Sequence, residues 1–235
     1  MLAFGSAYTF NKIELRYHRV NLGSSASLKH LNNMVQSITK LDIHSLEVLN
    51  TLKLQVTPEQ FEQLAIVNRD IRLERTSTGE LIVNPPTGSE SGRRNRSITG
   101  QLDRWYEENE ELGEAFDSST AFTLPNGAIR SPDASWVSRK LWTSLTALQK
   151  KGFAQVTPEF VVELRSPSDS LETLREKMRE YIDNGSLLGW LINPQDNQVE
   201  IYRKGQAVEL LENPTELSGQ DVLPGFSLNL KRVMA

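Results

Sequence analysis

The chain has 235 residues, a formal net charge of −4 at pH 7 and a sequence pI near 5.5. It contains no cysteine, which excludes disulfides, thiolate metal sites and a cysteine nucleophile. No apolar run approaches the roughly 18 residues that a membrane helix needs, and the first residues lack the basic and apolar parts of a secretory signal. An acidic chain is not expected to coat nucleic acid non-specifically, because that affinity comes mostly from Lys and Arg on phosphates. We therefore expect a cytoplasmic protein with no membrane contact.

The N-terminal part of the chain has the weakest pattern. We expect residues 1–50 to form an appendage and residues 51–235 to form one domain, since this length suffices for a single well-packed core. Residues 23–27 indicate a flexible joint. His18, His30 and His44 all lie in this part, and their spacing fits no metal site. Solvated histidines are the favoured interpretation.

After residue 57 the chain alternates between helix and strand patterns. Thr57, Pro58 and Glu59 predict a helix start, because Thr caps, Pro fits the first turn and Glu suits the helix dipole. Helices are further expected from about 92 to 107, from 138 to 150 and from 171 to 184. Strands are expected at 71–75, 81–84, 113–122, 131–137, 160–165, 188–193 and 199–203, before a hairpin and a last segment at 222–230. This order predicts an α/β or α+β fold with helices flanking one mixed sheet.

Glu163 is the most informative single residue. It lies in the segment 160–165, where apolar residues alternate and the carboxylate stands in the middle of the predicted strand. A buried carboxylate persists only with a cation, a hydrogen-bond network or a metal as its partner. The structural interpretation is an ion pair with Arg165, two residues on, or with a surface cation if the strand lies at the edge of the sheet. The functional interpretation is a catalytic or metal-binding acid.

Asp133 and Lys177 complete a candidate site. Asp133 follows Pro132, which by itself is common in turns, but two acids on separate strands of one sheet can face the same cleft. Paired carboxylates suit Mg²⁺, which binds few protein groups and keeps water ligands. Lys177 lies at the border of the apolar face of the helix 171–184, where most lysines only cover apolar surface with their stem. In a functional site it would contact a phosphate or orient water.

A cluster of cations forms a second candidate. Arg93, Arg94 and Arg96 follow Glu90 near the start of a predicted helix, where the helix dipole disfavours positive charge. This placement favours phosphate binding. A solvated face that pairs with the acidic turn at 107–111 is the alternative.

Five blocks together resemble a known family. They are 85–90 (PPTGSE), 131–133 (SPD), 162–168 (VELRSPS), 177–181 (KMREY) and 189–194 (GWLINP). In order and spacing they resemble the Uma-type family of restriction endonucleases, within the PD-(D/E)XK nuclease superfamily. The resemblance spans about residues 57–230 and implies a restriction-endonuclease-like fold that uses Mg²⁺, with Mn²⁺ as a substitute.

The resemblance also implies roles for single residues. Asp133 takes the place of the motif's aspartate, Glu163 that of its second acid, and Glu90 that of an acid from the preceding helix. Arg165 stands where the motif has a lysine, and an arginine does not readily exchange a proton. In this family the lysine is expected on the following helix, which indicates Lys177.

Three functions compete at this point. The leading one is a metal-dependent DNA endonuclease in which Asp133, Glu163 and Glu90 are metal ligands. Lys177 would be its catalytic cation, and Arg93, Arg94, Arg96 and Arg165 would bind nucleic acid. The second is a catalytically inactive module that keeps the nuclease fold for binding, since fold does not imply function. The third, a Ser or His hydrolase, is disfavoured because no Gly-x-Ser-x-Gly element is present. A homodimer would suit a double-strand cutter, although no stretch of sequence demonstrates one.

Overall fold

The structure is a computed structural model that describes residues 54–235, so the predicted appendage and all three histidines lie outside the described residues. The α-helices are α3 (Pro58–Val67), α4 (Ser89–Glu107), α5 (Arg139–Ser144), α6 (Ala147–Lys151), α7 (Leu171–Asp183) and α8 (Lys231–Met234), with a short 3₁₀ helix η2 (Glu110–Leu112). The strands are β1 (Arg72–Arg75), β2 (Leu81–Asn84), β3 (Gly113–Asp117), β4 (Phe122–Thr123), β5 (Ile129–Arg130), β6 (Ala134–Ser138), β7 (Phe160–Leu164), β8 (Leu188–Asn193), β9 (Gln198–Arg203), β10 (Glu209–Glu212), β11 (Glu216–Ser218) and β12 (Ser227–Asn229). No helix in this part of the chain is long and apolar enough to span a bilayer.

A six-stranded sheet carries the predicted motifs. Its strand order is β10-β9-β8-β7-β6-β3, and only the central pair β7–β8 is parallel. Parallel neighbours need a crossover connection, which α7 supplies. Ser170 caps the start of α7 by accepting from the backbone N–H of Thr173, and Gly185 follows its end at a φ of 119°, which favours glycine. Strand β7 and helix α7 are therefore held as one β-α-β unit.

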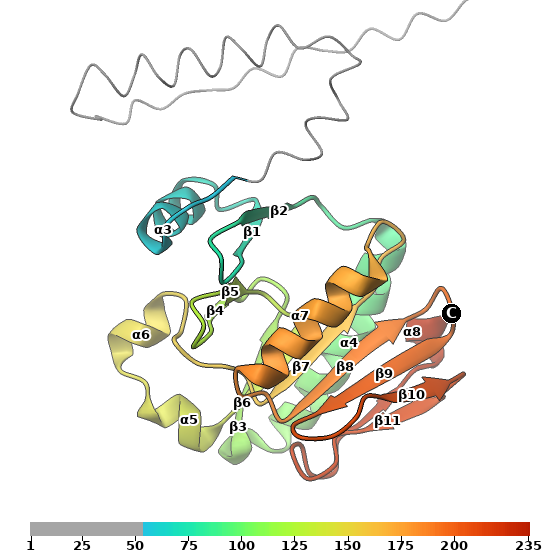
Figure 1. The fold of residues 1–235 in the computed structure, drawn as a ribbon. Helices are drawn as coiled ribbons and strands as arrows, with labels where there is room; N and C mark the ends of the chain where they lie inside the picture. Colours follow the sequence, from blue (N-terminus) through green and yellow to red (C-terminus); the bar gives the residue numbers. More distant parts are fainter. Residues whose placement is uncertain (1–53) are drawn as a thin grey trace, which may run out of the picture. The chain divides into compact units, whose positions relative to one another are not determined.

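The two faces of this sheet are covered by different helices, and Figure 1 shows α4 and α7 on opposite sides of it. Helix α4 packs Ile98, Leu102 and Trp105 against one face, where β7 contributes Phe160 and Val162. The large apolar area buried there stabilises the fold at roughly 25 cal/mol per Å². Because side chains alternate along a strand, the remaining residues of β7 point to the other face.

Helix α7 packs on that other face. Met178 and Tyr181 contact Val161 of β7 and Leu191 of β8 in a second, smaller core. Glu163 follows Val161 by two residues, so it also points towards α7. This arrangement places a carboxylate beneath a helix that carries Lys177.

The sequence predicted most element positions and missed several details. The β1–β2 hairpin does not join the large sheet, because β1 pairs with β5 in a separate four-stranded sheet of order β2-β1-β5-β4. The helix expected at 138–150 is two short helices, since Leu145 is the C-cap of the first and Thr146 caps the second with a capping box. The strands expected at 113–122 and 222–230 are shorter, at Gly113–Asp117 and Ser227–Asn229. Trp136 of β6 belongs to the core, because this residue is 5% exposed.

Candidate active site

The two predicted acids meet because of strand register. Strands β6 and β7 are antiparallel with Ala134 opposite Val162, and continuing this register by one residue brings Asp133 beside Glu163. The backbone N–H of Asp133 donates to the carbonyl of Val162 at 2.9 Å, one residue out of this register, so the backbone of Asp133 is still bound to β7. Both side chains are buried, with residue exposures of 8% and 3%. The predicted convergence of the acids is thus a property of the central sheet.

The carboxylate of Asp133 is held by three donors. Its Oδ2 accepts from the backbone N–H of Leu164 at 2.8 Å. Its Oδ1 accepts from Asn95 of α4 at 3.1 Å and from Nη1 of Arg72 at 3.2 Å. Three elements, β7, α4 and β1, therefore fix the position of this one side chain.

Lys177 lies between two acids. Its Nζ is 2.8 Å from Oε1 of Glu163 and 2.9 Å from Oε1 of Glu74 on β1. Burial opposes the charged form of this lysine, but Glu163 and Glu74 outweigh that effect and raise its pKa. Lys177 is consequently an ammonium at neutral pH, and its side chain is only 11% exposed.

Glu74 is a site residue that the sequence did not reveal. It is 3% exposed, and burial by itself would raise its pKa, but Lys177 and Arg130 reverse this and lower it. Nη1 of Arg130 lies 3.3 Å from Oε2 of Glu74, and Nε of the same arginine lies 2.6 Å from Oε2 of Glu180 on α7. Arg130 therefore ties the small sheet to α7.

Glu163 is an acid whose pKa is raised to the neutral range. Burial raises its pKa to about 7, Lys177 partly offsets this, and the negative charges of Asp133 and Glu74 add to the rise. The hydroxyl of Tyr181 donates to Oε1 of Glu163 at 3.1 Å from inside the core. A carboxyl that titrates near neutral pH at the centre of a polar cluster is a feature of functional sites.

Glu163 does not pair with Arg165, the cation two residues further along the chain. Arg165 points elsewhere: its Nη1 lies 3.2 Å from Oδ2 of Asp196 and 3.3 Å from Oδ1 of Asn193. The structural interpretation, an ion pair between Glu163 and Arg165, is therefore wrong. The interpretation of Lys177 as a cation that only covers apolar surface is also wrong, since its ammonium is buried between carboxylates.

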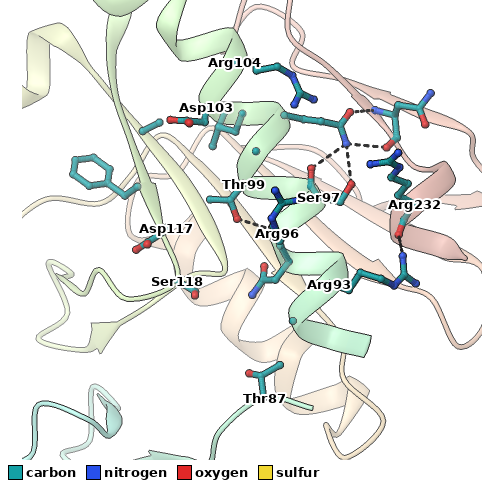
Figure 2. A pocket seen from close by; sticks show the side chains of 18 of the residues that line it. Thr87, Arg93, Arg96, Ser97, Thr99, Asp103, Arg104, Asp117, Ser118 and Arg232 are labelled. Atoms are coloured by element: carbon teal, nitrogen blue, oxygen red, sulfur yellow. Dashed lines mark hydrogen bonds between the residues drawn. The ribbon is translucent and has the colours of Figure 1, made fainter. Parts of the chain in front are cut away.

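The N-terminal half of α4 borders an open groove of about 1220 Å³. Figure 2 shows Arg93, Arg96 and Arg104 along one wall and Asp117 across from them. The basic side chains that line it are Arg93, Arg96, Arg104, Lys231 and Arg232. Asn95 also lines this groove, and its amide reaches Asp133, so one side chain connects the groove with the acidic cluster.

The arginines near the start of α4 differ in their surroundings. Arg93 donates to the backbone carbonyls of Arg232 and Ala235 at 2.8 and 2.6 Å, and Arg94 donates to Ala235 at 3.1 Å. Within residues 54–235, no group accepts a hydrogen bond from Arg96, which is exposed. Glu90 is also exposed, pairs with Arg93 at 2.9 Å, and has no interaction with the buried acids of the described chain.

The donor set suits a divalent cation. Asp133 and Glu163 offer hard carboxylate oxygens, and Mg²⁺ is commonly held by one or two carboxylates together with water. Among residues 54–235 no group of three or more His, Cys, Asp or Glu is arranged around one point, so the remaining ligands would be water or backbone oxygens. Arg72 and Lys177 now contact the carboxylates that such an ion would use.

A mixed sheet covered by helices, with acids on neighbouring central strands and a lysine on the crossover helix, defines a protein of the restriction-endonuclease-like class. The Uma2 family, described as "putative restriction endonuclease", matches residues 58–231. The chain belongs to this family. The resemblance found in the sequence is thereby confirmed over nearly the same range.

A solved structure has the same fold. It is described as a "putative nuclease belonging to DUF820" from Anabaena variabilis, and it superposes with a TM-score of 0.63 at 18% sequence identity. The similarity covers 76% of this chain and 97% of that one. A search of curated proteins returned no match. The structural likeness thus supports the fold, while the family assignment places the chain in a family described as putative restriction endonucleases.

Proposed function

We propose that this protein is a divalent-cation-dependent endonuclease that hydrolyses phosphodiester bonds in DNA. The observation that carries the proposal is the convergence of Asp133, Glu163 and Lys177, which come from three separate elements and lie within one buried cluster. Restriction-endonuclease-like families generally use divalent metals, and Mg²⁺ is the ion we propose, with Mn²⁺ as a substitute.

Each of these residues has a chemical task in the proposal. Asp133 and Glu163 would hold the cation, which would offset negative charge on the phosphate under attack. Lys177 would position the attacking water or contact the phosphate, because its ammonium already lies 2.8 Å from a ligand carboxylate. Glu163 with a pKa of about 7 is near the pH at which proton transfer is most efficient.

The groove beside α4 is the proposed path of the substrate. Five of its lining side chains are basic and two, Asp103 and Asp117, are acidic, whereas the chain as a whole carries a charge of −4. A local excess of arginines suits a phosphate backbone. Arg96 and Arg104 are the contacts we propose first, and Arg93 and Arg94 would contribute after leaving the carbonyls at the end of the chain.

Four further predictions from the sequence remain proposals. Glu90 would enter the site only as a ligand through water, because it now pairs with Arg93 on the surface. Arg165 would assist phosphate binding after release from Asp196. Cleavage of both strands would need two such centres, which a homodimer would supply, and we propose that the protein acts in the cytoplasm.

One observation favours the second candidate function, a binding module that keeps the fold without cleaving. Glu74, Asp133 and Glu163 are already paired with Lys177, Arg130 and Arg72, so the cluster is a satisfied network of charges. Such a network can serve structure alone.

The test is cleavage of supercoiled plasmid, single-stranded DNA and RNA with Mg²⁺, with Mn²⁺ or with EDTA. The proposal predicts metal-dependent nicking of DNA that is lost in Asp133→Ala, Glu163→Ala and Lys177→Ala. Activity that survives Glu163→Ala belongs to a contaminant or to another site. No cleavage by wild type, together with no rise in melting temperature on adding metal, supports the binding module.

A further inference from the structure

We propose that Arg72 occupies the position at Asp133 that a divalent cation takes, so that cation binding requires this guanidinium to leave the carboxylate. The inference rests on the proposed function, because it assigns Asp133 as a cation ligand. It adds a residue that controls the affinity of the site for metal. The family motifs identified in the sequence do not include Arg72.

The bonding of Asp133 leaves little room for another partner. Its Oδ1 already accepts from Arg72 and Asn95, and its Oδ2 accepts from the backbone of Leu164. A carboxylate has about four acceptor positions, so three of them are filled. Only one of the three donors is charged, and a second cation on the same carboxylate would be repelled by it. Arg72 is therefore the donor that a divalent cation displaces.

Arg72 is also the least enclosed cation of the cluster. Its side chain is 28% exposed, against 10% for Arg130 and 11% for Lys177. It is the first residue of β1, and its Nε is buried without a hydrogen-bond partner in the described part of the chain. Its other contacts are the carbonyl of Ser131, to which Nη2 donates, and Oε1 of Glu74 at 3.7 Å.

Lys177 and Arg130 are poorer candidates for displacement. Lys177 lies between two carboxylates at 2.8 and 2.9 Å, and Arg130 bridges Glu74 and Glu180. Removing Lys177 would leave the buried Glu163 without its cation, and removing Arg130 would leave Glu180 without its cation, which is costly. The loss of Arg72 from Asp133 is instead compensated at once by the arriving cation, and its long side chain reaches solvent.

The experiment measures metal binding without DNA. Mn²⁺ is titrated calorimetrically into the full chain as wild type, Arg72→Gln, Arg72→Lys, Asp133→Asn and Arg130→Gln. Displacement predicts that Arg72→Gln binds Mn²⁺ about fivefold more tightly than wild type. The reason is that wild type must break the ion pair between Arg72 and Asp133 before the cation binds, whereas the variant has no such pair to break. Arg72→Lys should fall between the two. Arg130→Gln, which removes a nearby charge that does not contact Asp133, should show a smaller increase than Arg72→Gln.

A second measurement uses the wild type, in case Arg72→Gln fails to fold. With arginines labelled by ¹⁵N, the Nε–H signal that is missing in Arg72→Lys is assigned to Arg72. Displacement predicts that Mg²⁺ shifts this signal in wild type and not in Asp133→Asn.

The outcomes separate the two proposals. Suppose that wild type binds Mn²⁺ through Asp133. If Arg72→Gln then binds Mn²⁺ no more tightly than wild type does, or no more tightly than Arg130→Gln does, displacement is wrong and the nuclease proposal stands. An Nε–H signal that Mg²⁺ leaves unchanged in wild type also overturns displacement. If wild type shows no Mn²⁺ binding that Asp133→Asn abolishes, the nuclease proposal fails and this inference fails with it.

Discussion

The ammonium of Lys177 lies 2.8 Å from Oε1 of Glu163, although the lysine is on helix α7 and the glutamate is on strand β7 beneath it. The contact depends on the β-α-β crossover, which lays α7 over the face of the sheet to which Glu163 points. The same ammonium contacts Glu74 from the small sheet at 2.9 Å. One lysine therefore connects three elements of the fold.

Removing this lysine should destabilise the fold. Lys177→Met keeps most of the volume but leaves Glu74 and Glu163 without their shared cation, and breaking a buried pair in this way costs about 3–5 kcal/mol. We expect that loss in the free energy of unfolding measured with urea. Adding Glu74→Gln to Lys177→Met should recover part of the lost free energy of unfolding, because one of the two carboxylates that shared the lysine is then a neutral amide.

Arg179→Met on the same helix is the matched control for this experiment. Arg179 is 52% exposed at its side chain and, within residues 54–235, forms a salt bridge only with the exposed Glu172, so its removal should change stability by about 0.5 kcal/mol or less. Equal losses for Lys177→Met and Arg179→Met would contradict the buried network.

The stability of the protein should depend on pH through Glu163. Burial raises its pKa from the ordinary value of 4.5 to about 7, so the folded state holds this proton over a range in which the unfolded state has released it. The contribution of Glu163 to stability is then greatest below pH 4.5, decreases as pH rises to about 7, and is constant above. Glu163→Gln cannot titrate and lacks this decrease.

The measurement for this pH effect is the unfolding free energy of wild type and Glu163→Gln across pH 4 to 8. Their difference cancels the titration of groups that do not interact with Glu163. If the unfolding free energy of wild type minus that of Glu163→Gln rises with pH or stays constant, the pKa of Glu163 is not raised.

Tyr181 should help to keep Glu163 ionised. Its hydroxyl donates to Oε1 at 3.1 Å, and a hydrogen bond to the charged form favours that form. Tyr181→Phe removes the donor without removing the ring, so the pKa of Glu163 should rise further and stability should fall by about 1 kcal/mol. The chemical shift of the Glu163 carboxyl carbon, followed against pH in ¹³C-labelled protein, reports this directly. A lower midpoint in Tyr181→Phe would show that the hydroxyl does not stabilise the carboxylate.

The sequence predicted the core of the site because the relevant signals are local. Glu163 stands out against the apolar residues of its own strand, Asp133 follows a proline before another strand, and Lys177 lies on the next helix. The short β7–α7–β8 connection then brings these elements together in one way. Local pattern and topology were enough for this much.

The sequence could not predict the outer partners, because their contacts span long distances along the chain. Glu74 is 103 residues from Lys177, and Arg72 is 61 residues from Asp133. Within β1 these residues alternate with Leu73, and charges on a four-residue strand give no sign of burial. The spacing of the sequence allowed Glu163 to pair with Arg165 as well as with Lys177. The pair with Arg165 does not form, because Arg165 contacts Asp196 in the loop after β8.

The single-turnover rate of plasmid cleavage with Mg²⁺ tests the central claim most directly, for wild type, Glu163→Gln and Glu200→Gln. Glu200 is a suitable control because it is also a buried acid of the same sheet, 7% exposed, and pairs with Arg175 at 2.6 Å outside the cluster. For variants that melt cooperatively, the account predicts a rate at least about 100-fold lower for Glu163→Gln and a rate near wild type for Glu200→Gln. Cleavage by Glu163→Gln at the rate of wild type, with melting equally intact, would contradict it.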